Sequence, residues 1–180
     1  MINEHNVLWL DLEMTGTNPE KDHIIQIAAI VTDQNLQFKA EGPEIVIHQP
    51  KEHMQTMSPE VCALHTNSGL LNRVYESKIS VEFAEREIIA FAKRYCIAGA
   101  TILCGNSIWV DRTFIKRYMP FFDQLLHYRM IDVSTIKELV ARWYPDKPKF
   151  EKKKQHTALS DIYESIEELR YYRKTYFVNL

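Results

Sequence analysis

Hydrophobic residues form near-continuous runs in the first part of the chain, and these runs predict buried β-strands. The first run covers Asn6–Met14 and ends at the turn-rich stretch Thr15–Pro19. The second run, His23–Asp33, places apolar side chains at every second position, and Glu44–His48 forms a third. Three strands in succession, with no helical pattern between them, predict an antiparallel beginning to a sheet.

After a long connection, the chain alternates between helical periodicity and short apolar runs. Apolar residues recur at intervals of three and four in Val81–Tyr95 and in Thr157–Phe177, which predicts two helices, the second being the longest. The other predicted elements are, in order, a strand over Thr101–Ser107, a helix over Asp111–Met119, a strand over Met130–Val133, a helix entered through a Thr135–Glu138 capping box, and a loop over Tyr144–Gln155.

This order of elements predicts an α/β fold, namely a mixed sheet whose first three strands are antiparallel and which is flanked by helices. The 180 residues suffice for a single core, so residues 1–180 are expected to form one domain. No apolar run approaches the ~18 residues of a membrane span. The first run is interrupted by Asp11 and Glu13 and is followed by no small-residue cleavage site, so a signal peptide is not expected either.

Charge and cysteine content limit the kinds of binding partner and the cellular compartment that we expect for this protein. Lys and Arg number 22 against 24 for Asp and Glu, and this net charge of -2 argues against a protein that coats long duplexes but allows a short nucleic acid. Cys62, Cys96 and Cys104 show no paired spacing, so neither a disulfide framework nor a cysteine zinc site is expected. We therefore expect a cytoplasmic protein with no membrane partner.

Two carboxylates inside the first apolar run are the strongest local sign of chemistry. Asp11 and Glu13 stand two residues apart on a predicted strand, so their side chains point to the same face. Two ionised carboxylates held together in a poorly solvated place must take up a proton or bind a cation. The pattern therefore predicts a divalent metal site, whereas an exposed strand end would make the same residues ordinary solvated acids.

Two acids rarely complete such a site, so further oxygen ligands are expected elsewhere in the chain. Asp111 follows a predicted strand end, although it also fits a helix N-terminal acid stabilised by the helix dipole. Asp132 is a rival whose place before Ser134 favours a capping role. His156 and Asp161 stand where the loop becomes the last helix, and their side chains converge only if His156 lies at or before the first turn. A histidine beside a loop is also commonly a solvated surface residue.

Ordered blocks along most of the chain resemble those of the DEDDh 3′→5′ exonucleases, which have an RNase H-like fold. The blocks that carry this resemblance are Trp9–Gly16, Cys104–Ser107 with Asp111, and His156 with Asp161. Within that superfamily the chain is more similar still to the oligoribonuclease family, through Ala40–Pro43, His65–Thr66 with Ser68–Leu70, His127–Arg129 with Asp132–Ser134, and Glu168–Leu169 with Tyr171–Arg173. Each block alone is weak, but agreement at so many spaced blocks is specific.

The resemblance implies a chemistry and a set of residues for it. It implies that Asp11, Glu13, Asp111 and Asp161 bind two divalent cations, Mg²⁺ or Mn²⁺, and that His156 is the general base. It also implies 3′→5′ hydrolysis of short single-stranded oligoribonucleotides, down to dinucleotides, to 5′-mononucleotides. The implied substrate-binding residues are His65, Ser107, Arg129 and Ser134, with Tyr128 reaching over from a second subunit of a homodimer.

Some positions depart from the family pattern, and other functions remain open. Thr17 stands where many relatives have a leucine wedge, and Glu60 stands where relatives often have a stacking aromatic residue. Met14 or Trp109 could replace these base contacts, although Trp109 fits a core position equally well. The lysines of Lys147–Lys154 are expected either to attract phosphates or to line a solvated loop.

A DNA-directed DEDDh exonuclease and a non-catalytic nucleic-acid-binding module are the alternatives to the oligoribonuclease prediction.

Overall fold

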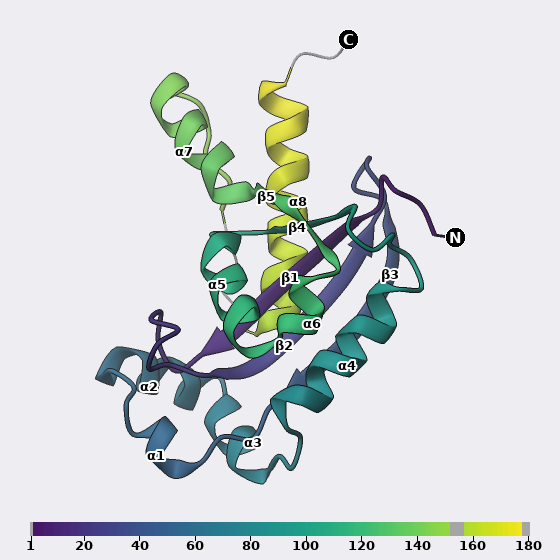
Figure 1. Cartoon of the computed structure of the whole chain (residues 1–180). Helices are drawn as coiled ribbons and strands as arrows, with labels where there is room; N and C mark the ends of the chain where they lie inside the picture. The colour runs from purple at the N-terminus through teal and green to yellow at the C-terminus, as the bar shows by residue number, and fades with distance from the viewer. Residues whose placement is uncertain (1, 152–156, 178–180) are drawn as a thin grey trace.

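The computed structural model describes residues 2–151 and 157–177, and a five-stranded sheet runs through its centre (Figure 1). The strand order is β3-β2-β1-β4-β5. β1, β2 and β3 pair antiparallel, whereas β4 runs parallel to β1 and β5 runs parallel to β4. The predicted mixed sheet with an antiparallel beginning is therefore confirmed. The strands are β1 (Val7–Met14), β2 (Ile24–Thr32), β3 (Phe38–Val46), β4 (Thr101–Gly105) and β5 (Leu126–Asp132).

Helices cover both faces of the sheet, which explains why its central strands are apolar throughout. All nine residues of β2 are buried. Side chains at even positions of β1, such as Leu8 and Leu10, pack into a core with residues of α4 (Val81–Ala92), α5 (Ile108–Tyr118) and α6 (Pro120–Asp123). Trp9 points to the other face, where the core includes residues of α7 (Val133–Trp143) and α8 (Ala158–Tyr176).

Three short helices fill the stretch for which the sequence predicted only a connection. They are α1 (Lys51–Met54), α2 (Pro59–Asn67) and α3 (Leu70–Glu76), and they lie together at one end of the sheet (Figure 1). A small core of Ile25, Met54, Leu70 and Val74 attaches α1 and α3 to β2. Each helix has at most two buried residues, which is too few to produce a recognisable helical period.

The two outer strands begin earlier than predicted. β3 starts at Phe38 instead of Glu44, and β5 starts at Leu126 instead of Met130. Both strands lie at edges of the sheet, where one side of the strand faces solvent, so fewer of their residues need to be apolar. In β5, only Leu126 is fully buried, and its neighbours are partly or fully exposed. The apolar run in the sequence therefore covers only part of each strand.

α4 and α8 begin within one residue of the predicted starts, but α4 ends at Ala92 instead of Tyr95, and α6 lies where no helix is predicted. α5 begins at Ile108, three residues before the predicted start. α7 begins at Val133 and is capped by Asp132, whose side chain accepts a hydrogen bond from the backbone N–H of Ser134. The predicted capping box at Thr135 is therefore wrong, and the capping role of Asp132 is confirmed. Within the described residues, no helix is long and apolar enough to cross a bilayer.

Candidate metal centre and substrate-binding region

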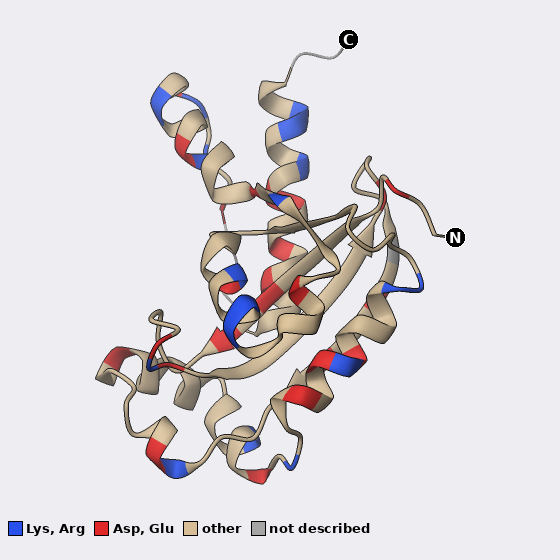
Figure 2. Cartoon of the chain, in the orientation of Figure 1, with Lys and Arg blue, Asp and Glu red and all other residues tan. Residues whose placement is uncertain are grey.

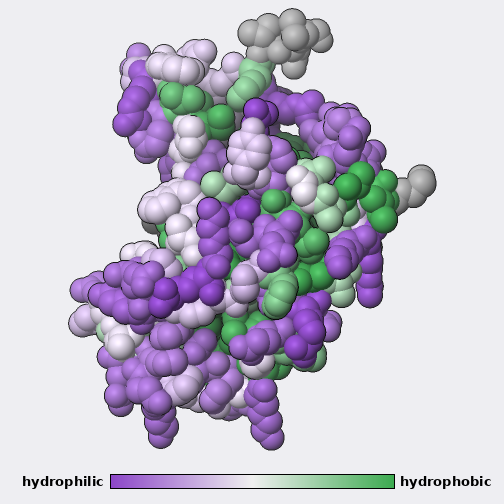
Figure 3. Space-filling model, in the orientation of Figure 1, coloured by the Kyte–Doolittle hydropathy of each residue, from purple (hydrophilic) through white to green (hydrophobic). Residues whose placement is uncertain are grey.

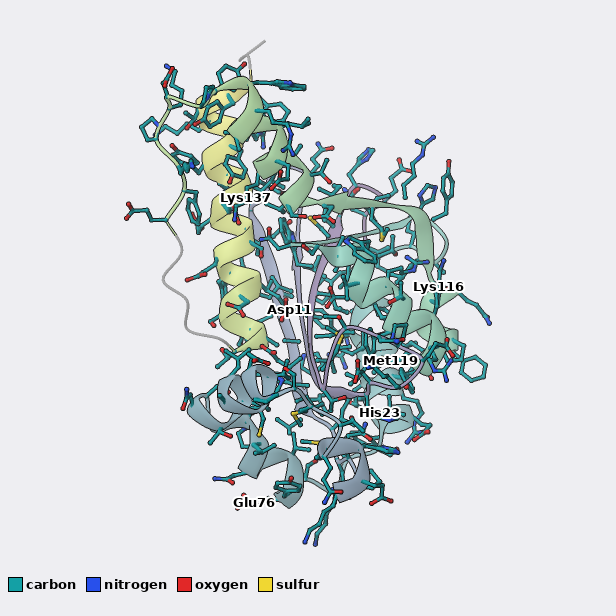
Figure 4. All side chains as sticks on the ribbon, turned by 90° about the vertical axis from the view of Figure 1, so that its left-hand side faces the viewer. Asp11, His23, Glu76, Lys116, Met119 and Lys137 are labelled. Carbon is teal, nitrogen blue, oxygen red and sulfur yellow. The ribbon has the colours of Figure 1, made fainter. Side chains whose placement is uncertain are left out.

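Three carboxylates gather where the end of β1 meets the beginning of α8. Asp11 and Glu13 share the face of β1 on which Trp9 packs, which is the face covered by α8. Asp161 lies in the first turn of α8, and one oxygen of each carboxylate lies within 4.8 Å of the others. Figure 2 shows these acidic segments of β1 and α8 near the middle of the molecule, and Figure 4 places Asp11 between α8 and the helices around Met119.

Asp111 approaches the same strand from α5, because β1 and β4 separate at this point. Pairing between the two strands ends at Trp9 and Cys104, which leaves the backbone N–H of Leu12 free of a β4 partner. The Oδ1 atom of Asp111 accepts this N–H at 2.9 Å. Because β1 and β4 are parallel, the acids lie at the carboxyl ends of adjacent parallel strands, where α/β proteins commonly bind ligands.

Burial and mutual repulsion make these acids hold protons more tightly than ordinary carboxylates. Burial and the nearby charge of Asp161 raise the pKa of Glu13 to about 7. Burial, with smaller contributions from Glu13 and Asp132, raises the pKa of Asp111 to about 7, although the N–H of Leu12 acts in the opposite direction. A divalent cation bound among these oxygens would relieve the repulsion, and hard oxygen donors are those that Mg²⁺ and Mn²⁺ prefer.

His65 lies behind this cluster, buried on α2. Its Nε2 atom lies 2.9 Å from the carbonyl oxygen of Met14, and its Nδ1 atom lies 3.9 Å from a carboxylate oxygen of Glu13. Because a carbonyl oxygen only accepts, Nε2 carries the proton in this contact. Burial lowers the pKa of His65, which favours the neutral imidazole. The side chain thus contacts both the end of β1 and one of the acids.

The two predicted substrate-binding serines lie together and are joined by Asp132. Its Oδ1 atom accepts hydrogen bonds from the backbone N–H of Ser107 at 2.9 Å and from the hydroxyl of Ser134 at 2.6 Å. The two serine hydroxyls are 3.4 Å apart. Ser107 adopts a left-handed backbone conformation at the start of α5, which turns its N–H towards β5. The sequence predicts the cap of α7 by Asp132 but not this second contact, because only the fold brings the ends of β4 and β5 together.

Tyr128 and Arg129 lie on the edge strand β5 and point to solvent. Tyr128 is 74% exposed, and the Arg129 guanidinium lies over its ring at 5.3 Å. Arg129 is exposed as well. Asp132 stands four positions after Tyr128, so along the strand the two residues are ~13 Å apart. Within one chain, Tyr128 therefore stands away from the end of the sheet where the acids lie.

Some predicted positions lie outside the cluster or outside the described residues. His156 and Lys152–Lys154 belong to residues 152–156, which the structure does not describe; Lys147 and Lys149 are exposed. Thr17 and Glu60 are exposed. Trp109 is 59% exposed in the first turn of α5, so the expectation of a core position is wrong.

The sequence of the chain matches those of known proteins over nearly its full length. The sequence profile of the family described as Exonuclease matches residues 8–169. An oligoribonuclease of Ruthia magnifica is 51% identical over 97% of this chain and 97% of its own length. An oligoribonuclease of Aliivibrio fischeri is also 51% identical, over 98% of each chain. The chain belongs to the oligoribonuclease family. Membership in this family of exonucleases makes it a nuclease, in agreement with the resemblance of its sequence blocks.

Solved structures confirm the fold that oligoribonucleases are expected to share. Exonuclease I of Methylocaldum szegediense superposes with a TM-score of 0.69 at 18% identity, over 95% of this chain. The zinc-bound complex of Escherichia coli exonuclease I with single-stranded DNA gives a TM-score of 0.72 at 17% identity, over 97% of this chain. The chain spans 41% of the length of each of these proteins. At this identity the likeness establishes an RNase H-like fold for the chain and nothing about its substrate.

Proposed function

We propose that this protein is a metal-dependent 3′→5′ exoribonuclease that hydrolyses short oligoribonucleotides, down to dinucleotides, to 5′-mononucleotides. The observation that carries the proposal is the cluster of Asp11, Glu13 and Asp161, with Asp111 against the same strand. Four acids around one strand end repel one another when they are ionised, and a cation bound among them would relieve that repulsion. The oligoribonuclease relatives, matched over nearly their full length, support RNA as the substrate and residues 1–180 as one exonuclease domain.

The acids would hold two divalent cations, Mg²⁺ or Mn²⁺. When bound, such cations polarise the scissile phosphate, lower the pKa of an attacking water and stabilise the leaving oxygen. Asp11 and Glu13 would ligate from β1, Asp161 from α8 and Asp111 from α5. Because the pKa values of Glu13 and Asp111 are near 7, these two side chains must lose their protons before they can act as ligands.

His156 would act as the general base that removes the proton of the attacking water. An ordinary histidine, with a pKa of ~6.5, can accept a proton near neutral pH. The water oxygen attacks phosphorus, the bond between phosphorus and the 3′-oxygen breaks, and that oxygen takes up a proton. A 5′-mononucleotide leaves, and the remaining chain ends in a 3′-hydroxyl.

Polar side chains of α2, α5, β5 and α7 would bind the end of a very short substrate. Ser107 and Ser134 present neighbouring hydroxyls at the carboxyl ends of β4 and β5. Arg129 would form a bidentate pair with a phosphate, a geometry that suits its guanidinium. His65, whose Nδ1 atom lies 3.9 Å from the Glu13 carboxylate, would be a further substrate contact.

A homodimer would complete the site, and Tyr128 would come from the second copy. Tyr128 is exposed on the edge strand β5, away from the end of the sheet where the four acids of the same chain lie. This position supports a contact with the site of another chain. The adjacent helix α7 stands out from the body of the molecule, and Figure 3 shows hydrophobic residues of α7 open to view. We place this dimer in the cytoplasm, where the three free cysteines would remain reduced.

A product time course with end-labelled RNAs of two to seven residues tests the proposal. We expect hydrolysis of every length to 5′-mononucleotides with Mn²⁺, and none after chelation. Asp11→Ala should abolish hydrolysis while retaining RNA binding, whereas Glu87→Gln, an exposed acid on α4, should behave like the parent. His156→Ala should lose most turnover but keep Mn²⁺ binding.

The same assay separates the alternatives. Faster hydrolysis of a long DNA strand than of a dinucleotide would favour a DNA-directed exonuclease. RNA binding without hydrolysis by the parent protein would favour a non-catalytic module. Light scattering tests the dimer: a monomeric parent that still degrades dinucleotides would contradict the role of Tyr128 as a partner residue.

A further inference from the structure

One face of α8 carries a row of polar side chains that extends from the acidic cluster into the core. Asp161, Ser165, Glu168 and Tyr172 follow one another at intervals of four, three and four residues, so they lie on the same side of the helix. Ser165, Glu168 and Tyr172 are 4%, 1% and 3% exposed. A carboxyl group buried this deeply is costly unless its hydrogen bonds are made. None of these three residues has a part in the proposed chemistry.

Asn106, at the end of β4, meets this row from the side of the sheet. Its Nδ2 atom donates to the Ser165 hydroxyl oxygen at 2.7 Å and to Oε2 of Glu168 at 3.1 Å. Because a carboxylate oxygen accepts, the amide nitrogen of Asn106 is the atom that faces Glu168. The hydroxyl of Tyr172 donates to Oε1 of the same carboxylate at 2.8 Å. Asn106 thus uses one side-chain nitrogen to contact two positions of α8.

The contact with Ser165 continues to the backbone of a proposed metal ligand. The hydroxyl of Ser165 donates to the carbonyl oxygen of Asp161 at 2.8 Å. A continuous path of hydrogen bonds therefore runs from the side chain of Asn106 to the residue that carries the Asp161 carboxylate. In the chain, Asn106 immediately precedes Ser107 and the helix α5 that carries Asp111.

We propose that Asn106 is a positioning residue that sets the place of Asp161 relative to Asp111 and Ser107. This inference rests on the proposed function, because it concerns how the acids are brought to a cation. α8 packs on the sheet through apolar contacts, which are non-directional and allow a helix to slide or rotate slightly. Two directed hydrogen bonds from a fixed strand end remove that freedom. Glu168 is the buried anchor that holds the amide in this orientation.

Metal binding by Asn106→Ala and Tyr172→Phe tests the inference. Both substitutions remove donors to Glu168, but only the first removes the link to Ser165 and Asp161. We expect Asn106→Ala to weaken Mn²⁺ binding about tenfold in calorimetry, since outer-shell partners of metal ligands contribute roughly 10- to 100-fold to affinity. Tyr172→Phe should lower the melting temperature of the metal-free protein while the Kd for Mn²⁺ stays within about twofold of the parent.

A second variant keeps the test decisive if Asn106→Ala does not fold. Ser165→Ala replaces the hydroxyl with a residue that favours helices and should weaken Mn²⁺ binding in the same direction. Equal Kd values for the parent, Ser165→Ala and Tyr172→Phe would overturn the positioning role, and so would equal weakening in Asn106→Ala and Tyr172→Phe. Failure of the parent itself to bind Mn²⁺ would instead contradict the proposed function.

Discussion

A change of pH from 8 to 6 should weaken Mn²⁺ binding strongly, because protons and the cation compete for the same carboxylates. The pKa values of Glu13 and Asp111 are raised to about 7, from ordinary values of 4.5 and 3.8. Each group is therefore ~90% protonated at pH 6 and ~10% protonated at pH 8. Each proton that must leave lowers the affinity about tenfold over this range, so the two together lower it up to about a hundredfold.

Calorimetry in two buffers with different ionisation enthalpies measures both the affinity and the protons released. We expect release of close to two protons from these carboxyls per site at pH 6 and about 0.2 at pH 8. Glu13→Gln should release about one proton fewer at pH 6, whereas Glu87→Gln, whose carboxyl is exposed, should match the parent. A Kd that is the same at both pH values, without proton release, would refute the reasoning.

The stability of the metal-free protein should follow the same titration with a definite sign. Because the pKa values of Glu13 and Asp111 are higher in the folded than in the unfolded state, the folded state binds more protons between about pH 4 and pH 7. Their contribution to the free energy of unfolding therefore decreases as the pH rises through this range. Mn²⁺ should reverse the loss, so its effect on the melting temperature should be larger at pH 8 than at pH 6.

Three further predictions concern substrate binding and stability. Arg129→Ala should weaken dinucleotide binding about tenfold, since a hydrogen bond to a charged group contributes ~1.5 kcal/mol or more; affinity equal to the parent would exclude a phosphate contact. Asp132→Ala should lower the free energy of unfolding by ~1 kcal/mol through the lost cap of α7, and urea titration would show whether it does. Gly16→Ala should lower the free energy of unfolding by ~1–3 kcal/mol, because the new Cβ would overlap the carboxylate of the buried Asp22; an unchanged urea midpoint would contradict this clash.

Elements with strong periodicity could be predicted from the sequence, and weakly periodic ones could not. β1 and β2 are buried on both faces, so nearly every residue is apolar, and α8 is long enough to repeat its pattern over several turns. The edge strands β3 and β5 and the short helices α1 to α3 bury too little surface to show a clear pattern. Their positions depend on contacts with distant parts of the chain.

The pairing of Asp11 with Glu13 was determined by the sequence alone, since the period of a strand places both side chains on one face. The resemblance to exonucleases named Asp111 and Asp161, but their convergence on β1 depends on the tertiary structure. β1 and β4 must separate before the N–H of Leu12 can receive Asp111, and α8 must cross β1 at Asp11. The pKa values near 7 likewise exist only in the fold, because a carboxyl group holds its proton more tightly when water is removed and another charge is brought close.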